Sequence, residues 1–271
     1  MNVGFIGLGN MGSAIAIGLL GNGGLEPGQV KLANRSPGKA QDLSLRFPGA
    51  EVVKGNDRLA EQCGIIFVSV RSDQVLDVLK EISSQRQGSH LVITNGGFTL
   101  DQIEKICPGA VSKLIPSITM EVGRGVSLVC YGSRVTSEQR DILENMLRKA
   151  SMVKIVPEEK LDVAADLTSC GPALIAEMMG QFSSAGVRHG QIVPEEAWGM
   201  VLETLVGVAL ALQNGIGVEE LKSKVATKGG ITEQGLKVLE RELPGVFDQM
   251  IEATLTKYSM VRKSMAEQFD D

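Results

Sequence analysis

Gly7, Gly9 and Gly12 have the spacing of a turn that binds the pyrophosphate of a dinucleotide. An apolar run at residues 2–6 leads into this turn, and an apolar segment at residues 13–20 leaves it. The first glycine would allow the tight bend, the second a close approach of the backbone to the phosphates, and the third close packing of helix on strand. The N–H groups at the start of that helix would bind the anion. The spacing alone is a weak signal, because a glycine-rich turn without a ligand is the simpler interpretation.

Asn34, Arg35 and Ser36 strengthen that signal. In an NAD-selective site, an acidic residue about twenty residues further on binds the ribose 2′-hydroxyl. A carboxylate there would repel a 2′-phosphate, whereas the planar guanidinium of Arg35 can pair with it. The alternatives are that Arg35 is a solvated surface charge and that Ser36 only caps a helix beginning at Pro37. The two features together predict NADPH as the cofactor.

A second group with chemical potential contains Gly229 and Gly230, followed by a helix that Thr232 opens. Successive backbone N–H groups beside a helix amino terminus suit a carboxylate, and the hydroxyl groups of Thr227 and Thr232 would add donors. The simpler interpretation is structural, because Thr232 is a good helix cap and Ile231 has the spacing of a hydrophobic staple. The residues alone leave both interpretations open.

The elements that would position these groups alternate between strand and helix in the first half of the chain. Strands are predicted at residues 2–6, 29–33, 64–69, 90–94, 113–115, 126–131 and 152–156. Helices are predicted at residues 12–21, 38–46, 56–62, 73–83, 99–105 and 137–149. This alternation indicates a mostly parallel, doubly wound α/β sheet with its ligand crevice at the carboxyl ends of the strands.

From about residue 157 onward the strand signals disappear. Helices are predicted at residues 161–168, 172–189, 194–214, 218–224, 232–241 and 244–269. We therefore predict a dinucleotide-binding domain at 1–156 and an all-α domain at 157–271. The segment 198–212 is apolar nearly all round, so it is predicted to be buried on every side. Association with a second copy is favoured over a helix buried within one chain.

The composition argues against several classes of partner and site. The net charge of −5, with scattered basic residues, argues against a nucleic-acid or acidic-membrane partner. The four cysteines are widely separated and there are two histidines, so no metal site is expected. No signal peptide and no membrane span is evident, and a cytoplasmic protein is expected.

Several segments, in the same order, resemble the pyrroline-5-carboxylate reductase family over nearly the whole chain. These are residues 4–15, the triplet at 34–36, Asn56, the run 168–173 and the stretch 229–240. The resemblance implies a Rossmann domain followed by an all-helical dimerisation domain. It also implies NADPH-dependent reduction of a cyclic imine, 1-pyrroline-5-carboxylate, to L-proline by a homodimer or larger homo-oligomer. Little acid–base machinery is needed, because a protonated iminium is already electrophilic.

The turn and the resemblance together predict the site residues. Cofactor binding is assigned to Gly7, Leu8, Gly9, Asn10, Met11, Asn34, Arg35, Ser36, Asn56, Val70 and Arg71. Substrate binding is assigned to Ser117, Thr227, Gly229 and Gly230. Thr232 is the predicted catalytic residue, through a hydrogen bond to the imine nitrogen.

Three segments depart from the family pattern. Residues 71–73 read Arg-Ser-Asp where the family usually has Lys-Pro-Gln, and residues 116–119 read Pro-Ser-Ile-Thr instead of Pro-Asn-Thr-Pro. Residues 227–231 read Thr-Lys-Gly-Gly-Ile, so Lys228 adds a cation beside the anion site. Such changes are similar to those in the late-competence reductase-like branch of spore-forming bacteria. They keep open a regulatory, redox-sensing NADPH-binding protein without proline-forming turnover.

A β-hydroxyacid dehydrogenase is a third hypothesis, because the glycine turn also resembles that family. Those enzymes carry a catalytic lysine at the start of their second domain. The corresponding residues 168–176 contain no lysine, which disfavours this hypothesis.

Overall fold

The structure, a computed structural model, describes residues 1–86 and 88–270. The chain divides into two compact units. The first comprises Met1–Pro172 together with the residues from Thr254 onward, and the second comprises Ala173–Ala253.

The first unit is built on an eight-stranded sheet. Its strands are β1 (Val3–Ile6), β2 (Val30–Ala33), β3 (Glu51–Val52), β4 (Ile65–Val68), β5 (His90–Ile93), β6 (Val111–Ile115), β7 (Val126–Tyr131) and β8 (Met152–Ile155). Their order is β3-β2-β1-β4-β5-β6-β7-β8, and every neighbouring pair is parallel except β6 and β7. The predicted mostly parallel, doubly wound sheet is confirmed. The sequence missed β3, which has only two residues and no apolar pattern of its own.

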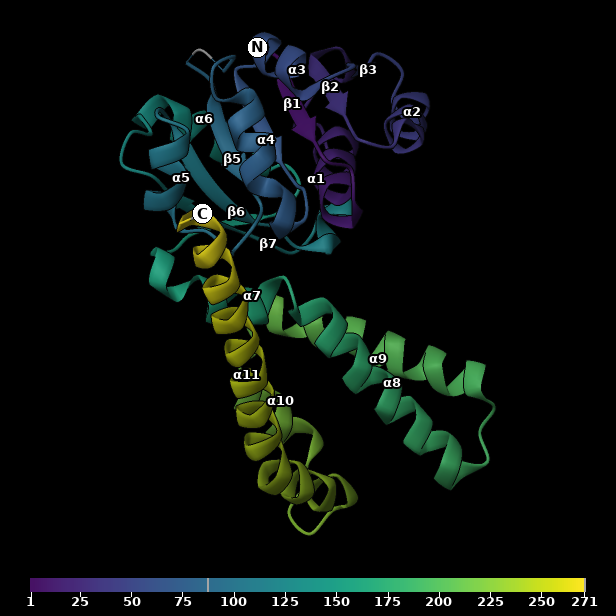
Figure 1. The fold of residues 1–271 in the computed structure, drawn as a ribbon. Helices are drawn as coiled ribbons and strands as arrows, with labels where there is room; N and C mark the ends of the chain where they lie inside the picture. The colour runs from purple at the N-terminus through teal and green to yellow at the C-terminus, as the bar shows by residue number, and fades with distance from the viewer. Residues whose placement is uncertain (87, 271) are drawn as a thin grey trace. The chain divides into compact units, whose positions relative to one another are not determined.

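Helices cover both faces of this sheet (Figure 1). One face packs on α1 (Asn10–Gly21), α2 (Pro37–Arg46) and α6 (Ser137–Leu147). The other packs on α3 (Asn56–Gln62), α4 (Val75–Ile82) and α5 (Leu100–Ile106). The residues of β1 and β4 are buried throughout, as expected of strands covered on both faces. Side chains alternate between the two cores, so that Phe5 stacks on Phe67 in one while Ile6 packs in the other.

Short turns and one further helix complete the first unit. Single 3₁₀ turns are η1 (Pro27–Gln29), η2 (Ser72–Gln74), η3 (Ile118–Val122) and η4 (Glu158–Lys160). After η4, α7 (Leu161–Thr168) packs on the same face of the sheet as α5. The last turns of α11 (Ile231–Asp270) join it there, and Met265 enters the same core as Leu161 and Ala165.

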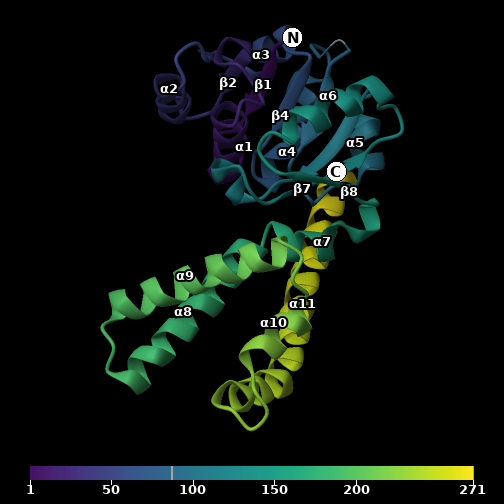
Figure 2. The ribbon, with the colours of Figure 1, turned by 180° about the vertical axis from the view of Figure 1, so that it is seen from behind.

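The second unit is entirely helical, as predicted. It contains most of α8 (Gly171–Gly190), then α9 (Pro194–Gln213), α10 (Val218–Val225) and the first part of α11. Helices α8 and α9 lie side by side, as both views show (Figure 2).

One predicted helix boundary is wrong. The sequence predicts a break at Pro244, between helices at 232–241 and 244–269, but α11 continues through this residue. A proline inside a helix removes one N–H donor and crowds the preceding turn. The helical bonds before and after it remain, and helix propagation is cooperative, so one lost bond does not end the helix.

Apolar side chains on α9 are exposed within the single chain. Trp198 is 41% exposed, Met200 54% and Leu210 51%, and Ala197 is the buried residue of this helix. The prediction that residues 198–212 are buried on every side is therefore wrong for the chain by itself. The reason is that a helical hairpin gives each helix one neighbour, which covers only part of its circumference. No helix in the described ranges 1–86 and 88–270 is long and apolar enough to cross a membrane.

Candidate dinucleotide and carboxylate sites

The turn between β1 and α1 has no room for side chains at two of its three glycines. Gly7 has a φ of +87°, and a Cβ on it would lie 2.6 Å from the carbonyl oxygen of Ser69. A Cβ on Gly12 would lie 2.0 Å from the carbonyl oxygen of Gly7. A Cβ on Gly9 would meet nothing within 4 Å, so this position faces open space. The turn therefore offers the cradle that a pyrophosphate requires at the start of α1.

Asn34 ties the glycine turn to the end of β2. Its Oδ1 accepts a hydrogen bond from the backbone N–H of Leu8 at 2.9 Å, and its Nδ2 donates to the carbonyl of Ser36 at 2.8 Å. The N–H of Gly7 donates to the carbonyl of Ala33 at 3.0 Å. Arg35 follows with its side chain exposed. The segment that would select the 2′-phosphate is thus held directly against the segment that would bind the pyrophosphate.

The structure adds Lys39, which the sequence analysis missed. A hollow of about 380 Å³ lies beside the turn, lined in part by Gly9, Asn10 and Lys39. Lys39 stands in the first turn of α2, four residues after Arg35, and its ammonium adds to the positive potential there. The available signal in the sequence was a second basic residue in the first turn of the helix that follows Arg35.

Ser69 connects the turn to the next strands. Its N–H donates to the carbonyl of Ile6 at 2.8 Å, and its hydroxyl accepts from Thr94 Oγ1 at 3.1 Å. Val70 and Arg71 follow, and the Arg71 guanidinium pairs with Asp73 at 2.7 Å. The sequence analysis assigned Val70 and Arg71 but missed Ser69 and Thr94, whose contact joins two strand ends distant in sequence.

Two predicted residues lie in other surroundings. Asn56, at the start of α3, donates from Nδ2 to Glu81 on α4 at 2.8 Å. Ser117 is fully buried, and its hydroxyl lies 2.8 Å from that of Thr119. A side chain at Gly125 would also press against Ser117. The Ser117 hydroxyl thus holds the turn after β6 and is not directed to the surface.

The second unit carries the predicted carboxylate site in the loop between α10 and α11. Gly229 has a φ of +76°, and the N–H of Gly230 donates to the carbonyl of Thr227 at 2.9 Å. The N–H of Gly229 donates to Glu233 Oε2 at 2.8 Å. An internal carbonyl and an internal carboxylate therefore already accept from the N–H groups of Gly230 and Gly229. Ile231 is 95% exposed, so the hydrophobic staple is absent at this described position.

The two histidines lie outside these groups. His90 is buried at the start of β5, where Nε2 lies 2.7 Å from Ser112 Oγ. Burial, with a smaller effect of Arg86, lowers the pKa of His90 to about 4, so the imidazole is neutral at pH 7. His189 is exposed at the end of α8. Among the described residues, no three His, Cys, Asp or Glu side chains gather as metal ligands would.

Two known protein families match this chain, one in its first part and one in its second. Residues 2–96 match the family described as "NADP oxidoreductase coenzyme F420-dependent", and residues 158–261 match "Pyrroline-5-carboxylate reductase dimerisation". The chain is 31% identical over 251 residues to a pyrroline-5-carboxylate reductase of Methanobrevibacter smithii, covering 89% of this chain and 98% of that protein. It is 27% identical over 271 residues to ComE operon protein 4 of Bacillus subtilis, covering 99% of each. A solved pyrroline-5-carboxylate reductase from Coxiella burnetii has a TM-score of 0.87 at 26% identity, covering 96% of this chain and 98% of that one.

An open, mostly parallel sheet with a glycine turn between its first strand and helix defines a Rossmann-type oxidoreductase that uses NADP. The helical segment at residues 158–261, which matches a dimerisation family, distinguishes one family within this class of oxidoreductases. The chain belongs to the pyrroline-5-carboxylate reductase family. The fold class and the NADP cofactor predicted from the sequence are therefore confirmed.

Proposed function

We propose that this protein reduces the cyclic imine 1-pyrroline-5-carboxylate to L-proline with NADPH. The observation that carries the proposal is the 31% identity to a pyrroline-5-carboxylate reductase along 89% of the chain. The loop of residues 226–230 supports it chemically, because the Gly229 N–H already binds a carboxylate, that of Glu233, next to the helix start, and Thr227 adds a hydroxyl to the same loop.

NADPH, when bound, supplies the hydride for the imine carbon. In the proposed mechanism, the Thr227 hydroxyl and the Gly229 N–H hold the substrate carboxylate, which displaces the Glu233 carboxylate from Gly229. The Gly230 N–H stays on the Thr227 carbonyl and closes the turn. The Thr232 hydroxyl hydrogen-bonds the imine nitrogen, which keeps its proton and becomes the amine of the product. Ser117 contributes by holding the turn after β6, since its hydroxyl is buried. These residues position a substrate that is already electrophilic, so no strong acid or base is required.

The experiment is NADPH oxidation by the purified protein with pyrroline-5-carboxylate. We expect Gly230→Ala to raise the KM for the imine by about tenfold or more, because a Cβ there would lie 2.6 Å from Thr227 Oγ1. Thr232→Ala is expected to lower kcat. Gly235→Ala is the matched control, because a Cβ at that position meets nothing within 4 Å.

Equal effects of Gly230→Ala and Gly235→Ala would contradict a role of the loop in substrate binding. The absence of turnover by the wild-type protein with pyrroline-5-carboxylate would contradict the proposed function itself.

Arg35 is proposed to select NADPH. Arg35→Asp is expected to raise the KM for NADPH by about 100-fold and to change that for NADH far less, because it replaces an attractive charge with a repulsive one. Steady-state kinetics with both cofactors measure this. Arg58→Asp, an exposed arginine on α3, is the control for the change of charge. The same effect on both cofactors would exclude a contact between Arg35 and the 2′-phosphate.

A regulatory protein that binds NADPH without forming proline is the second candidate. It is favoured by the likeness to ComE operon protein 4 and by Lys228, which adds a cation beside the carboxylate loop. In that case NADPH binds, yet no imine is turned over.

We also propose that the protein acts as a homodimer or larger homo-oligomer. The exposed apolar side chains of α8 and α9, Phe182 and Trp198 among them, support this, as does the match of residues 158–261 to a dimerisation family.

A further inference from the structure

The first unit contains a second cavity, at the carboxyl ends of β5 and β6. Its volume is about 660 Å³, within the range of small-molecule sites. Thr94 and Phe98 line it from the segment after β5, Ile115 from the end of β6, and Tyr258 from α11. None of the residues that the sequence assigns to the cofactor or to the imine lines this cavity, and Thr94, which contacts Ser69, is shared with the surroundings of the glycine turn.

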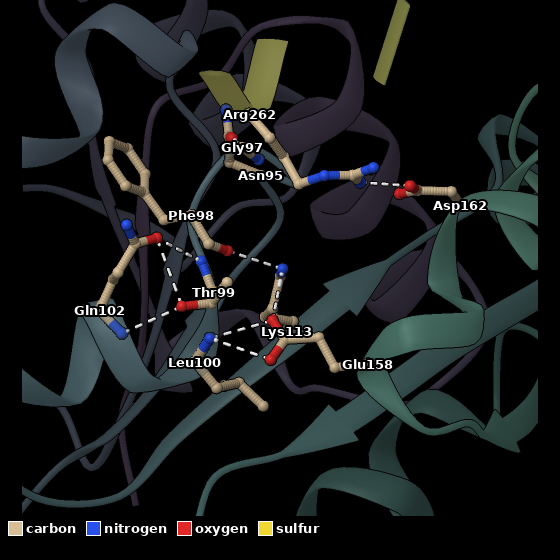
Figure 3. A network of polar contacts seen from close by, with 10 residues as sticks. All are labelled: Asn95, Gly97, Phe98, Thr99, Leu100, Gln102, Lys113, Glu158, Asp162 and Arg262. Atoms are coloured by element: carbon tan, nitrogen blue, oxygen red, sulfur yellow. Dashed lines mark hydrogen bonds and ion pairs between the residues drawn. The ribbon is translucent and has the colours of Figure 1, made fainter. Parts of the chain in front are cut away.

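A buried cation stands in the wall of the cavity. The Lys113 side chain is 4% exposed, and its ammonium donates to the Phe98 carbonyl at 2.7 Å and to Glu158 at 2.8 Å (Figure 3). An ammonium group has three donors, so these contacts use two of them. Lys113 lines the cavity, and one donor of its ammonium has no partner in the protein contacts given above.

A second ion pair lines the cavity on its helical side. The guanidinium of Arg262, on α11, pairs with the carboxylate of Asp162, on α7 (Figure 3). Glu159 also lines the wall. Two cations and three carboxylates therefore surround one small space. A ligand with a single charge would face groups of its own sign, whereas a ligand with both signs can face a partner with each.

Apolar surface and one phenol complete the wall. Phe98 and Leu161 are buried core residues, and Ile115 packs beside them. The Tyr258 hydroxyl lies 3.5 Å from Cys170 Sγ. Burial, with the contact to Cys170, raises the pKa of Tyr258, so the phenol stays protonated and can donate a hydrogen bond. The apolar part suits a short hydrocarbon ring or chain.

We propose that this cavity binds a small zwitterion that carries one carboxylate and one cationic nitrogen on a short apolar ring. Arg262 and Lys113 receive the carboxylate, and the carboxylates of Glu158, Glu159 and Asp162 receive the nitrogen. The choice of a ring rests on the proposed function, because L-proline, its product, belongs to this class. The residues that line the cavity all belong to the first unit, and those of the carboxylate loop belong to the second.

Isothermal titration calorimetry tests this with three probes of similar size. L-Proline carries both charges, cyclopentanecarboxylate only the anion and pyrrolidine only the cation. All titrations use the Gly230→Ala background, in which binding at the carboxylate loop is expected to be weakened about tenfold or more. L-Proline is expected to bind, and each singly charged probe to bind at least tenfold more weakly.

Two variants address the cavity directly. Arg262→Gln removes its exposed cation, and Ser169→Met fills space beside it from a residue that lines the wall. Each is expected to weaken L-proline binding at least tenfold. Arg241→Gln is the matched control, because it removes an arginine from the same helix outside the cavity. Thermal denaturation verifies that every variant is folded.

Three results would overturn the proposal. These are no binding of L-proline in the Gly230→Ala background, equal binding of the three probes, or unchanged affinity in both Arg262→Gln and Ser169→Met. The proposed function fails separately, through absent imine turnover by the wild-type protein, and the calorimetric result does not depend on that turnover.

Discussion

Replacing Gly12 with alanine is expected to abolish measurable NADPH binding and to destabilise the first unit. A Cβ at this position would lie 2.0 Å from the carbonyl oxygen of Gly7 and 3.0 Å from Ser69 Cβ. The nearest contact is with backbone, so no change of side-chain rotamer can relieve it. Helix α1 must then move away from β1, and its first N–H groups leave the position from which they bind the pyrophosphate. We expect a loss of about 1–3 kcal/mol in the free energy of unfolding, as for overpacked cores.

Fluorescence titration with NADPH and chemical denaturation measure the two effects separately. Gly9→Ala separates binding from folding, because Gly9 has an extended backbone and a Cβ there meets nothing within 4 Å. It is expected to weaken NADPH binding while leaving the unfolding free energy nearly unchanged. Gly21→Ala, at the other end of α1 and equally unhindered, controls for glycine replacement within this helix. If Gly12→Ala bound NADPH with wild-type affinity, the turn would not be the pyrophosphate site.

The second large effect is expected at Lys113. Lys113→Met removes a buried ammonium and leaves the Glu158 carboxylate with one remaining donor, the N–H of Leu100 at 2.9 Å. Breaking a buried ion pair by removing one partner costs about 3–5 kcal/mol. We expect about 3 kcal/mol, at the lower end, because the Glu158 side chain keeps 30% exposure to solvent. Equilibrium unfolding in urea measures the loss.

The double variant Lys113→Met with Glu158→Gln tests whether the loss of stability comes from the Glu158 carboxylate being left without its cation. The amide oxygen of Gln can still accept from Leu100, and no buried charge is left without a partner, so part of the stability should return. Lys105→Met is the matched control, because its ammonium pairs with Asp101 on the exposed side of α5 and should contribute less than about 1 kcal/mol. A loss at Lys113 no larger than that at Lys105 would contradict the buried-pair argument.

The first site could be located from the sequence because its signal is local. Gly7 is required by its positive φ and Gly12 by the nearby carbonyl of Gly7, and Arg35 follows at the separation that one strand–helix–strand unit imposes. Apolar runs of four or five residues likewise predicted most strands, since strands covered on both faces need little else. The resemblance to one reductase family came from the order of several such local segments.

Other features depend on which distant residues meet, and no spacing in the sequence encodes them. Thr94 lines the second cavity and contacts Ser69 because β5 lies beside β4. Lys113 is buried because β6, the start of α5 and η4 converge on its ammonium. The sequence predicts that Ser117 binds the substrate, yet the turn after β6 encloses its hydroxyl. The exposure of α9 in the single chain could not be predicted either. An apolar helix face indicates that some other surface must cover it, but the sequence pattern does not show whether that surface belongs to the same chain or to another.

The sequence by itself thus determined the cofactor class, the doubly wound sheet and the family, because each rests on local backbone requirements and on the period of apolar residues. Only the tertiary structure decided the place of Lys39 beside the glycine turn, the burial of Lys113 and the cavity with paired charges. Those depend on side chains from separate strands and helices, which become neighbours only when the chain has folded.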